Sequence, residues 1–292
     1  MSTPALLPSV RIRRATPADA SVCGQIFYDA FANINSAHGF LPELPSAEAA
    51  IAIMDMLFSH TSFHCVVAEQ DGHILGSNCL DLRSPVAGLG PISVDPSVQN
   101  RGVGRLLMMS LIDEVRERGL PGVRLLQAAF HGRSLSLYAK LGFDVREPIA
   151  VMSGHAAIRA IEGYTVRPTL SDDEAVCASL CERVHGFART GELREAVAQG
   201  LARVVERHGR VTGYASGFGY FGHAVAETTD DLMVLIGSAQ EVSGPGILVP
   251  LRNTELFRWC LDNGLRVFQP MTLMTIGLYN EPRGAYLPSV LY

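Results

Sequence analysis

The chain has 292 residues, of which 48% are hydrophobic and 18% charged, and its formal net charge is −5 at neutral pH. This length allows two domains with a core each, and the composition excludes an intrinsically disordered chain. The negative charge argues against nucleic acid or an anionic membrane as the main partner. No apolar run is long enough for a signal peptide core or a membrane span, so we expect a cytoplasmic protein.

The six cysteines indicate buried thiols rather than a metal or redox motif. None is part of a CxxC sequence. Cys23 and two later cysteines fall on apolar helix faces, while Cys65 and Cys79 fall in predicted strands, so we expect reduced, buried side chains. His60 and His64 are four residues apart but lack a neighbouring carboxylate or cysteine pair, and no metal site is expected.

The N-terminal third is predicted to contain a strand, two helices and a β-hairpin. Thr16 is expected to cap the first helix, with Pro17 at its first position and Asp19 three residues after the cap. Asp71-Gly72 indicates a tight hairpin turn. The expected elements are a strand over 10–14, a helix with apolar residues from 23 to 31, a loop over 33–45, a helix over 46–57 and strands over 64–70 and 73–82.

The most informative stretch is 90–118, which is predicted to form a strand, a turn and a long amphipathic helix. The strand is expected over 89–94 because Pro96 cannot continue it. The helix is expected to begin at Val103, because apolar residues then recur at helical spacing. Further strands are expected over 123–129 and 143–152, separated by a short helix over 133–140.

The turn before this helix is suited to an anion. The first N–H groups of a helix have no partner within the helix and carry partial positive charge. Gly102 and Gly104 lack the Cβ atoms that would block an anion, and Arg101 and Arg105 add positive charge on both sides. A tight strand-to-helix turn is the alternative explanation for the two glycines.

Two sequence patterns resemble one known family. The pattern Val-Asp-Pro-x-x-Gln-x-x-Gly-x-Gly-x-x-Leu at 94–107 resembles the acetyl-CoA signature of the GNAT N-acetyltransferases. The segment Leu-Tyr-x-Lys-Leu-Gly-Phe at 137–143 resembles the later helix and turn of the same family. The resemblance, which covers residues 10–150, implies an α/β (α+β) acyl-CoA N-acyltransferase fold with a twisted mixed β-sheet flanked by helices.

The resemblance implies that acetyl-CoA is the acyl donor. Its pyrophosphate is expected on the backbone amides of residues 101–105, and its pantetheine arm beside the strand that ends at Val94, where a backbone N–H would stabilise the oxyanion. The family often has an asparagine where this chain has His131. The expected cofactor-binding residues are Ile92, Ser93, Val94, Gln99, Asn100, Arg101, Gly102, Val103, Gly104, Arg105, His131 and Ser134.

Tyr138 is the expected catalytic residue. A phenol with a pKa near 10 is protonated at neutral pH and can donate a proton to the departing thiolate. A core tyrosine is the alternative explanation. His38, Glu43 and Asp81 are expected on the acceptor side, as substrate-binding residues and as options for the general base. Each also suits a solvated surface position, and ordered water is a further route for the proton.

The second half of the chain repeats features of the first, which indicates a divergent duplication with domains at 1–155 and 156–292. The motif Glu206-x-x-Gly209-x-x-x-Gly213 repeats Glu69-x-x-Gly72-x-x-x-Gly76. Ser171 and Glu174 are expected to form a capping box, and a strand is expected over 231–237. The boundary is expected within 154–163.

The second copy is expected to be degenerate, without acetyl-CoA binding. Pro245 in the segment 238–246 has no N–H for an anion, and Cys260 stands where the first copy has Tyr138. This half is expected to complete the substrate site, to stabilise the first half or to form a homodimer surface. The apolar tail 286–292 is expected to dock in the second domain or across an interface.

These features predict an N-acetyltransferase that transfers the acetyl group of acetyl-CoA to a primary amine, of a small molecule or a protein, by direct attack in a ternary complex. The loop 33–45 would suit a cationic or partly apolar amine. An idle acyl-CoA-binding or sensor protein is the alternative. A narrower alternative is the tandem mycothiol synthases, in which the C-terminal copy is the working one.

Overall fold

A computed structural model gives the structure of residues 10–156 and 161–291. Part of the expected boundary (157–160) and Tyr292 of the tail lie outside the described residues. The helices are α1 (Ala20–Ala37), α2 (Ala47–Ser59), α3 (Val103–Glu117), α4 (Gly132–Lys140), α5 (Glu174–His185), α6 (Thr190–Ala198), α7 (Thr229–Gly237) and α8 (Thr254–Asp262). The first strands are β1 (Arg11–Arg14), β2 (Phe63–Gln70), β3 (His73–Asp81), β4 (Ala87–Leu89), β5 (Ser93–Val94), β6 (Gly122–Ala128) and β7 (Asp144–Ser153). The later strands are β8 (Tyr164–Pro168), β9 (Arg203–Arg207), β10 (Arg210–Ala215), β11 (Ala224–Ala226), β12 (Ile247–Pro250), β13 (Arg266–Gly277) and β14 (Ala285–Leu287).

The order of elements in the first half, from β1 to β7, recurs from β8 to β13. Both hairpins turn on two residues with positive φ, Asp71-Gly72 and His208-Gly209, as a tight hairpin requires. The same ion-pair network also recurs. Arg13 pairs with Asp19 and Glu69, and the equivalent arginine of β8 pairs in the same way. That arginine is Arg167, and its partners are Asp173 and Glu206.

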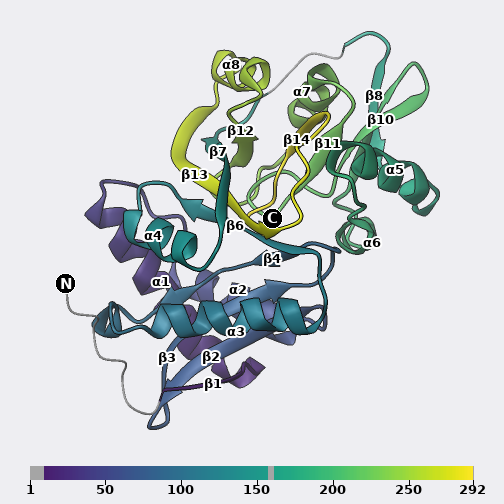
Figure 1. The fold of residues 1–292 in the computed structure, drawn as a ribbon. Helices are drawn as coiled ribbons and strands as arrows, with labels where there is room; N and C mark the ends of the chain where they lie inside the picture. Colours follow the sequence, from purple (N-terminus) through teal and green to yellow (C-terminus); the bar gives the residue numbers. More distant parts are fainter. Residues whose placement is uncertain (1–9, 157–160, 292) are drawn as a thin grey trace.

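The two halves share one sheet. Its strand order is β1-β2-β3-β4-β6-β13-β7-β12, with β5 paired to β3, and a second sheet has the order β14-β11-β10-β9-β8. Strand β13 of the second half therefore lies between β6 and β7 of the first half, and β7 lies between β13 and β12. In Figure 1 the long yellow-green β13 passes from the upper to the lower half of the molecule. The two-domain division remains a prediction, with strands that cross it.

Helices cover both faces of the first part of this sheet. Successive residues of a strand point to opposite faces. Val66 and Ala68 accordingly pack in the cluster that contains α3, whereas Cys65 and Val67 pack in the cluster with α1 and α2. Figure 1 shows α3 in front of β2 and β3, with α1 and α2 behind them. The expected twisted sheet flanked by helices is confirmed.

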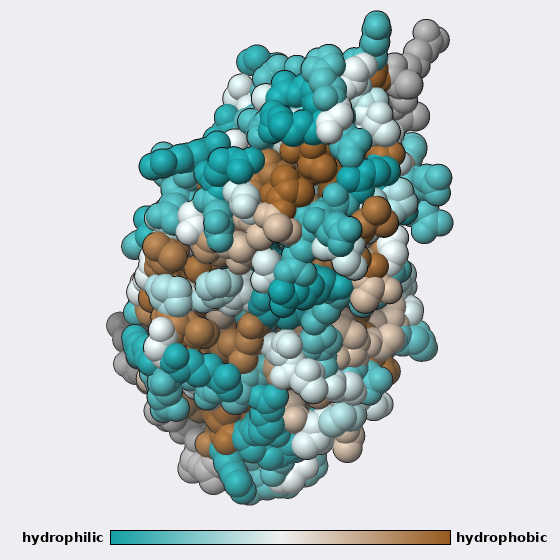
Figure 2. Space-filling model, turned by 90° about the vertical axis from the view of Figure 1, so that its right-hand side faces the viewer, coloured by the Kyte–Doolittle hydropathy of each residue, from teal (hydrophilic) through white to brown (hydrophobic). Residues whose placement is uncertain are grey.

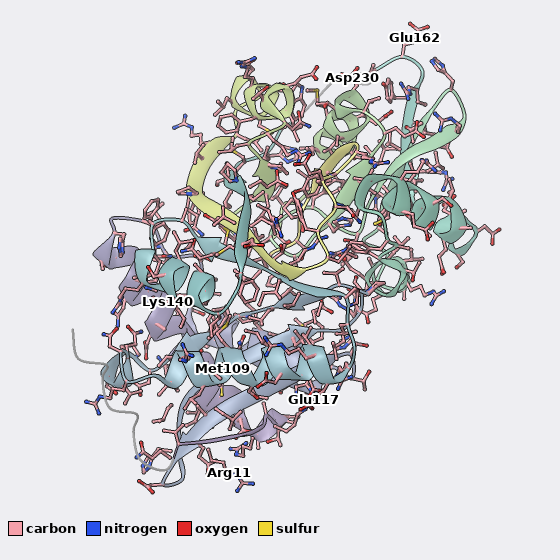
Figure 3. The ribbon with its side chains drawn as sticks, in the orientation of Figure 1. Arg11, Met109, Glu117, Lys140, Glu162 and Asp230 are labelled. Atoms are coloured by element: carbon pink, nitrogen blue, oxygen red, sulfur yellow. A yellow bond between two sulfur atoms is a disulfide. The ribbon has the colours of Figure 1, made fainter. Side chains whose placement is uncertain are left out.

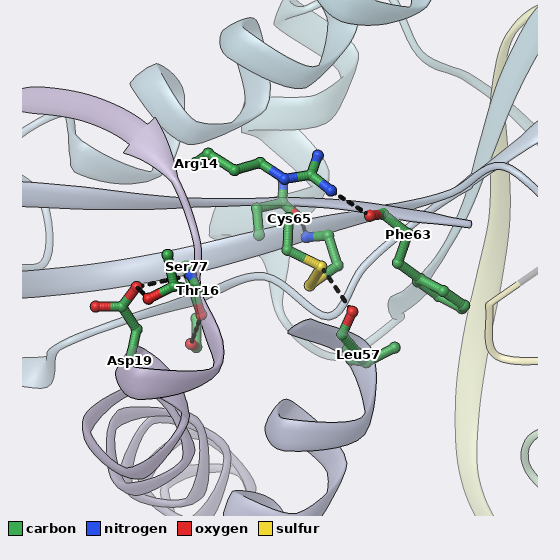
Figure 4. The surroundings of a disulfide bond; sticks show 10 residues. Arg14, Thr16, Asp19, Leu57, Phe63, Cys65 and Ser77 are labelled. Atoms are coloured by element: carbon green, nitrogen blue, oxygen red, sulfur yellow. Dashed lines mark hydrogen bonds between the residues drawn. A yellow bond between two sulfur atoms is a disulfide. The ribbon is translucent and has the colours of Figure 1, made fainter. Parts of the chain in front are cut away.

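The prediction of six reduced thiols is wrong for one pair. Cys65 and Cys79 form a disulfide between β2 and β3 (Figure 4). The reason is the register of the hairpin, which places these two residues directly opposite each other with their Cα atoms 4.0 Å apart. Cys23 and three later cysteines are free and buried, as expected.

Two expected elements of the first half have different bounds. Helix α1 continues through Ala37, so the expected loop 33–45 begins with a further helical turn. The expected strand over 89–94 is interrupted at Gly90-Pro91, where Gly90 has a φ of 140° and Pro91 has no N–H for a ladder. The strand therefore divides into β4 and β5.

Two predictions for the second half are wrong. Residues 231–237 belong to helix α7, because Thr228 caps its N-terminus. The Thr228 side chain accepts from the N–H of Asp231, and the Asp231 carboxylate accepts from the N–H of Thr228. The expected pair of Ser171 and Glu174 does not form the cap of α5. The carboxylate of Asp173 accepts from the N–H of Leu170 instead, which repeats the contact of Asp19 with Thr16.

The exposed face of α3 carries Met109 and Glu117, both labelled in Figure 3. Figure 2 shows one face of the molecule, on which apolar patches lie between polar side chains. None of the helices in the described ranges is both long and apolar enough to cross a membrane.

Candidate functional site

A cavity of about 640 Å³ opens where two neighbouring strands separate. β4 pairs with β6 only at residues 87–88, and after the break at Gly90-Pro91 the chain continues as β5, which pairs with β3. The gap between β5 and the end of β6 is therefore left open, and Ser93, Val94 and Gln127 lie in its wall. The break that divides the predicted strand is thus the feature that creates the cavity.

The N-terminus of α3 forms one side of this cavity. Gly102 has a φ of 89°, a conformation that favours glycine, and it allows the chain to turn from the loop into the helix. Gly104 is different, because a Cβ there would meet Val94 and Leu137 only at 3.6 and 3.8 Å, which are ordinary contacts. Both glycines line the cavity, so the amides of the first helical turn remain accessible.

Two arginines bring positive charge to this side of the cavity. Arg105 of α3 and Arg133 of α4 both line it. The Arg133 guanidinium also donates to Asn100 Oδ1 at 3.1 Å, while Gln99 Nε2 donates to the carbonyl of Val94 at 3.2 Å. These bonds hold the loop between β5 and α3 in place. Helix N–H groups and two guanidinium groups thus meet on this side of the cavity, an arrangement that suits an anion.

The N-terminus of α4 forms the neighbouring wall. Gln127 of β6 donates to the carbonyl of His131 and to Ser134 Oγ, both at 3.0 Å, and so ties the strand to the helix. Burial, with the charges of Arg133 and His38, lowers the pKa of His131 to about 4. The His131 imidazole is therefore neutral at neutral pH.

Tyr138 lies in α4 with 7% of its surface exposed, and it lines the cavity. Its ring packs beside Phe143, with 6.2 Å between the ring centroids. Burial raises the pKa of the Tyr138 phenol, so the hydroxyl stays protonated over the whole physiological range. The structure thus places a protonated, buried O–H in the wall of the cavity.

Glu43 brings a carboxylate to the same cavity, and a residue of the second half holds it. The hydroxyl of Tyr220 donates to Glu43 Oε2 at 2.7 Å. Tyr220 is 7% exposed, and burial together with the Glu43 carboxylate raises its pKa well above the usual value. Glu43 is the only carboxylate among the described residues that line the cavity.

The structure does not bring the other expected acceptor-side residues into the cavity wall. His38 is exposed at the end of α1, where its ring contacts Phe130 at a centroid distance of 5.3 Å. The carboxylate of Asp81 is buried and accepts hydrogen bonds from the backbone N–H and the guanidinium of Arg83, which also pairs with Glu195 of α6. Arg101, expected at the pyrophosphate, lies outside the lining residues. All the other expected cofactor-binding residues are in the wall.

The equivalent positions of the second half are built differently. At the N-terminus of α7, Thr228 and Asp231 satisfy the helix cap, and Asp230 adds a second carboxylate. In α8, which repeats α4, Cys260 is buried at the position equivalent to Tyr138. A helix start with two carboxylates repels phosphate, and a buried thiol in place of the phenol removes the proton donor.

Sequence reasoning left the role of the second half open among three options and named neither its residues nor those of the tail as part of the cavity. Tyr220, Phe221 and Met271 line the cavity, as do Val290 and Leu291. The tail was expected to dock in the second domain or across an interface; its start pairs with β11 of the second half, but Val290 and Leu291 pack with the core around α1 and α2 of the first half. The carbonyl of Leu291 lies where a Cβ on Gly88 would be, 1.6 Å away, so β4 admits the tail only because Gly88 has no side chain. No sequence signal indicated Tyr220, which is 177 residues from Glu43.

Comparison with known sequences shows a family similarity over part of the N-terminal half. Residues 29–143 match the profile described as the Acetyltransferase (GNAT) family. Over this segment the chain is similar to the GNAT family. A mycothiol acetyltransferase of Nocardia farcinica is 41% identical over 63 residues, 22% of this chain and 21% of that protein. A [ribosomal protein bS18]-alanine N-acetyltransferase of Salmonella typhimurium is 43% identical over 58 residues, 20% of this chain and 39% of that protein. The chain thus spans well under half the length of these relatives.

Solved structures with the GNAT fold match almost the whole chain. A putative acetyltransferase from Pyrococcus horikoshii has a TM-score of 0.74 at 18% identity and covers 98% of this chain and 97% of its own. A tandem GNAT protein from the clavulanic acid biosynthesis pathway has a TM-score of 0.55 at 13% identity and covers 92% of this chain and 98% of its own. At these identities the likeness shows the fold alone.

Proposed function

We propose that the protein is an N-acetyltransferase that transfers the acetyl group of acetyl-CoA to a primary amine, of a small molecule or a protein. The observation that carries this proposal is the cavity between β5 and β6, which joins an anion site to a protonated tyrosine. The GNAT match over residues 29–143 supports acetyl transfer in general. The relative named an alanine N-acetyltransferase supports an amino group as acceptor.

Acetyl-CoA would bind with its pyrophosphate at the amides of residues 102–105 and near Arg105 and Arg133. The pantetheine arm would lie beside Ile92, Ser93 and Val94, where β5 leaves an open edge toward β6, and the neutral His131 would contact it from α4. A backbone N–H near Val94 would stabilise the oxyanion. The donor would then present its carbonyl carbon to the cavity.

The transfer needs two proton movements. The amine, after loss of a proton to water or to a base, attacks the carbonyl carbon, and the carbon–sulfur bond breaks as the intermediate collapses. Tyr138 would donate its proton to the departing thiolate. The thiol that forms has a pKa near 8.5, below that of the phenol, so the proton moves only as negative charge develops on the sulfur. Asp81 is paired with Arg83 outside the cavity and His38 is not in its wall, so ordered water is the proposed proton acceptor and Glu43 is the alternative.

We propose that only the N-terminal copy, within 1–155, binds acetyl-CoA, and that the copy within 156–292 is degenerate. The carboxylates at the start of α7 and the buried Cys260 support this assignment. The alternative is an idle acyl-CoA-binding or sensor protein on the same fold. The buried hydroxyl of Tyr138 favours the enzyme, because a sensor has no need for a proton donor at the thioester.

Calorimetric titration of acetyl-CoA into the wild type and a Gly104→Glu variant tests the cofactor site. Gly104 has room for a Cβ and a helical backbone, and a carboxylate at a helix N-terminus is favourable to folding, so this variant should fold. Its carboxylate would repel the pyrophosphate. We expect one site per chain in the wild type and no binding in the variant, with Gly104→Ala as the matched control that retains binding.

An assay with a panel of amines then separates enzyme from sensor. Tyr138→Phe should lower kcat about 10²-fold and leave acetyl-CoA binding unchanged, because it removes only the proton donor. Tyr28→Phe, a change of the same kind outside the cavity wall, should have no effect. Absence of acetyl-CoA binding by the wild type would overturn the proposal, and two sites per chain would overturn the degenerate second copy.

A further inference from the structure

The acceptor side of the cavity has a chemical character of its own, separate from that of the anion site. The charged groups of the wall come from different elements. Arg105 and Arg133 belong to α3 and α4, whereas Glu43 belongs to the loop between α1 and α2. The two cations suit a phosphate-bearing donor, and the carboxylate suits a cation.

Most of the rest of the acceptor side is apolar, with Asn35 of α1 as a polar exception. Side chains from four separate parts of the chain converge there, from α1, α2, β13 and the tail. They are Phe27, Phe31, Ile53, Met271, Val290 and Leu291. Such a wall offers few hydrogen bonds to a hydroxylated molecule, whereas burial of an apolar body against it is favourable.

Glu43 is held so that one oxygen is available. Tyr220 donates to Oε2, and Gln269 Nε2 lies 3.5 Å from the same hydroxyl, which directs the phenol proton toward the carboxylate. Oε1 makes no hydrogen bond or ion pair with the residues that the structure describes. Tyr220 remains protonated because burial and the Glu43 charge both raise its pKa. The carboxylate is therefore a fixed anion in an apolar wall, with one oxygen open to a ligand.

We propose that the acceptor is a primary amine with an apolar body, whose ammonium group binds Glu43 Oε1, and that Tyr220 of the second half is the positioning residue for this carboxylate. This inference rests on the proposed function, because it names the substrate class for the same cavity. It also gives the C-terminal half a role in the acceptor site. The apolar body lies against the aromatic and aliphatic wall, and the cation forms a charge-assisted hydrogen bond.

The test uses the full-length protein, acetyl-CoA and two probe amines, hexylamine and ethanolamine, with release of CoA as the measurement. The two amines share the primary amino group and differ in the apolar body. We expect kcat/KM for hexylamine to exceed that for ethanolamine at least about tenfold. Glu43→Gln should raise the KM for hexylamine about 10-fold or more and leave the KM for acetyl-CoA unchanged.

Two further variants distinguish positioning from a structural role. Tyr220→Phe keeps the ring and removes the hydroxyl, so we expect a rise of about fivefold in the KM for hexylamine with kcat and the KM for acetyl-CoA unchanged. Asp55→Asn removes an exposed carboxylate of α2 outside the cavity wall and should change neither constant. A fall in kcat for both amines with Tyr220→Phe would contradict positioning, because it would indicate general disruption.

The outcomes separate the inference from the function on which it rests. If acetyl-CoA does not bind, the proposed function fails. If acetyl-CoA binds but ethanolamine is acetylated as well as hexylamine, or hexylamine is not acetylated, the inference fails and the acetyl-CoA site stands. An unchanged KM for hexylamine in Glu43→Gln also overturns the inference.

Discussion

At the scale of single residues, the molecule keeps two imidazoles away from water. His185 and His223 are fully buried, with their Nε2 atoms 3.2 Å apart. Burial lowers the pKa of both well below 6.5, and the positive charges of Arg124 and Arg189 lower them further. Both rings are therefore neutral in the folded protein at neutral pH. The His185 ring packs against Tyr286 of β14, so this pair lies within the second half.

This pair predicts acid sensitivity of the fold. The folded pKa values lie below the unfolded value of about 6.5, so below that pH the unfolded chain binds more protons and the free energy of unfolding falls as the pH falls. Each histidine contributes a slope of up to about 1.4 kcal/mol per pH unit. Urea unfolding between pH 7.5 and pH 5 should show this loss.

The matched variants for this prediction are His223→Gln and His73→Gln. The first removes one buried imidazole and should reduce the slope of stability against pH, even if it lowers stability at pH 7. The second changes an exposed histidine of the first hairpin and should leave the slope unchanged. An equal slope in the wild type and in His223→Gln would contradict the assignment.

At the scale of elements, Gly102 and Gly104 flank one turn, but only one of the two positions needs glycine for its backbone conformation. Gly102 ends the loop with a positive φ of 89°, whereas Gly104 has a helical conformation and room for a Cβ. The first is a backbone requirement of the turn from β5 to α3. The second leaves open the space in front of the helix N-terminus, which the fold itself does not require.

Alanine at each position separates these two reasons. Gly102→Ala should lower the free energy of unfolding by about 1–2 kcal/mol, because it forces an L residue into the left-handed region. Gly104→Ala should leave it unchanged or raise it by up to about 1 kcal/mol, since alanine is the better helix former. Urea denaturation of both variants measures this difference, and equal stabilities would show that the turn tolerates a side chain at Gly102.

At the scale of the whole molecule, the two halves are joined by more than the linker. Strand β13 pairs with β6 and β7 over most of its length, and Leu291 of the tail packs in the core formed by α1 and α2. The side chains of Leu273 and Met274 in β13 are buried, so they belong to the core of the shared sheet. A single sheet through both halves makes their folding interdependent.

Separation of the halves tests this interdependence. Residues 1–155 expressed alone would lack β13, so the edges of β6 and β7 would be unpaired and apolar surface exposed. We expect this fragment to aggregate or to unfold without cooperativity, and co-expression with 156–292 to restore a soluble complex. As a control, a full-length chain cleaved between residues 155 and 161 after folding should remain associated. A soluble 1–155 fragment with the melting temperature of the whole protein would contradict the prediction.

The sequence by itself determined the elements whose signals are local. The helix face after Val103, the cap at Thr16, the turn at Asp71-Gly72 and the GNAT patterns over 94–107 and 137–143 depend on neighbouring residues, and the structure forms helices, strands and turns there. At residues 231–237 the local signal failed, because this apolar run suits a strand or a helix equally and the cap at Thr228 decides between them.

Only the tertiary structure decided what depends on distant pairs. The disulfide of Cys65 and Cys79 follows from the register of β2 and β3, and the exchange of β7 and β13 from pairing between the halves. The bond from Tyr220 to Glu43 joins side chains 177 residues apart. Such contacts leave no periodic trace in either segment, so the sequence predicted the glycine- and arginine-lined wall of the cavity and proposed Glu43, whereas only the fold brought Tyr220 to that carboxylate.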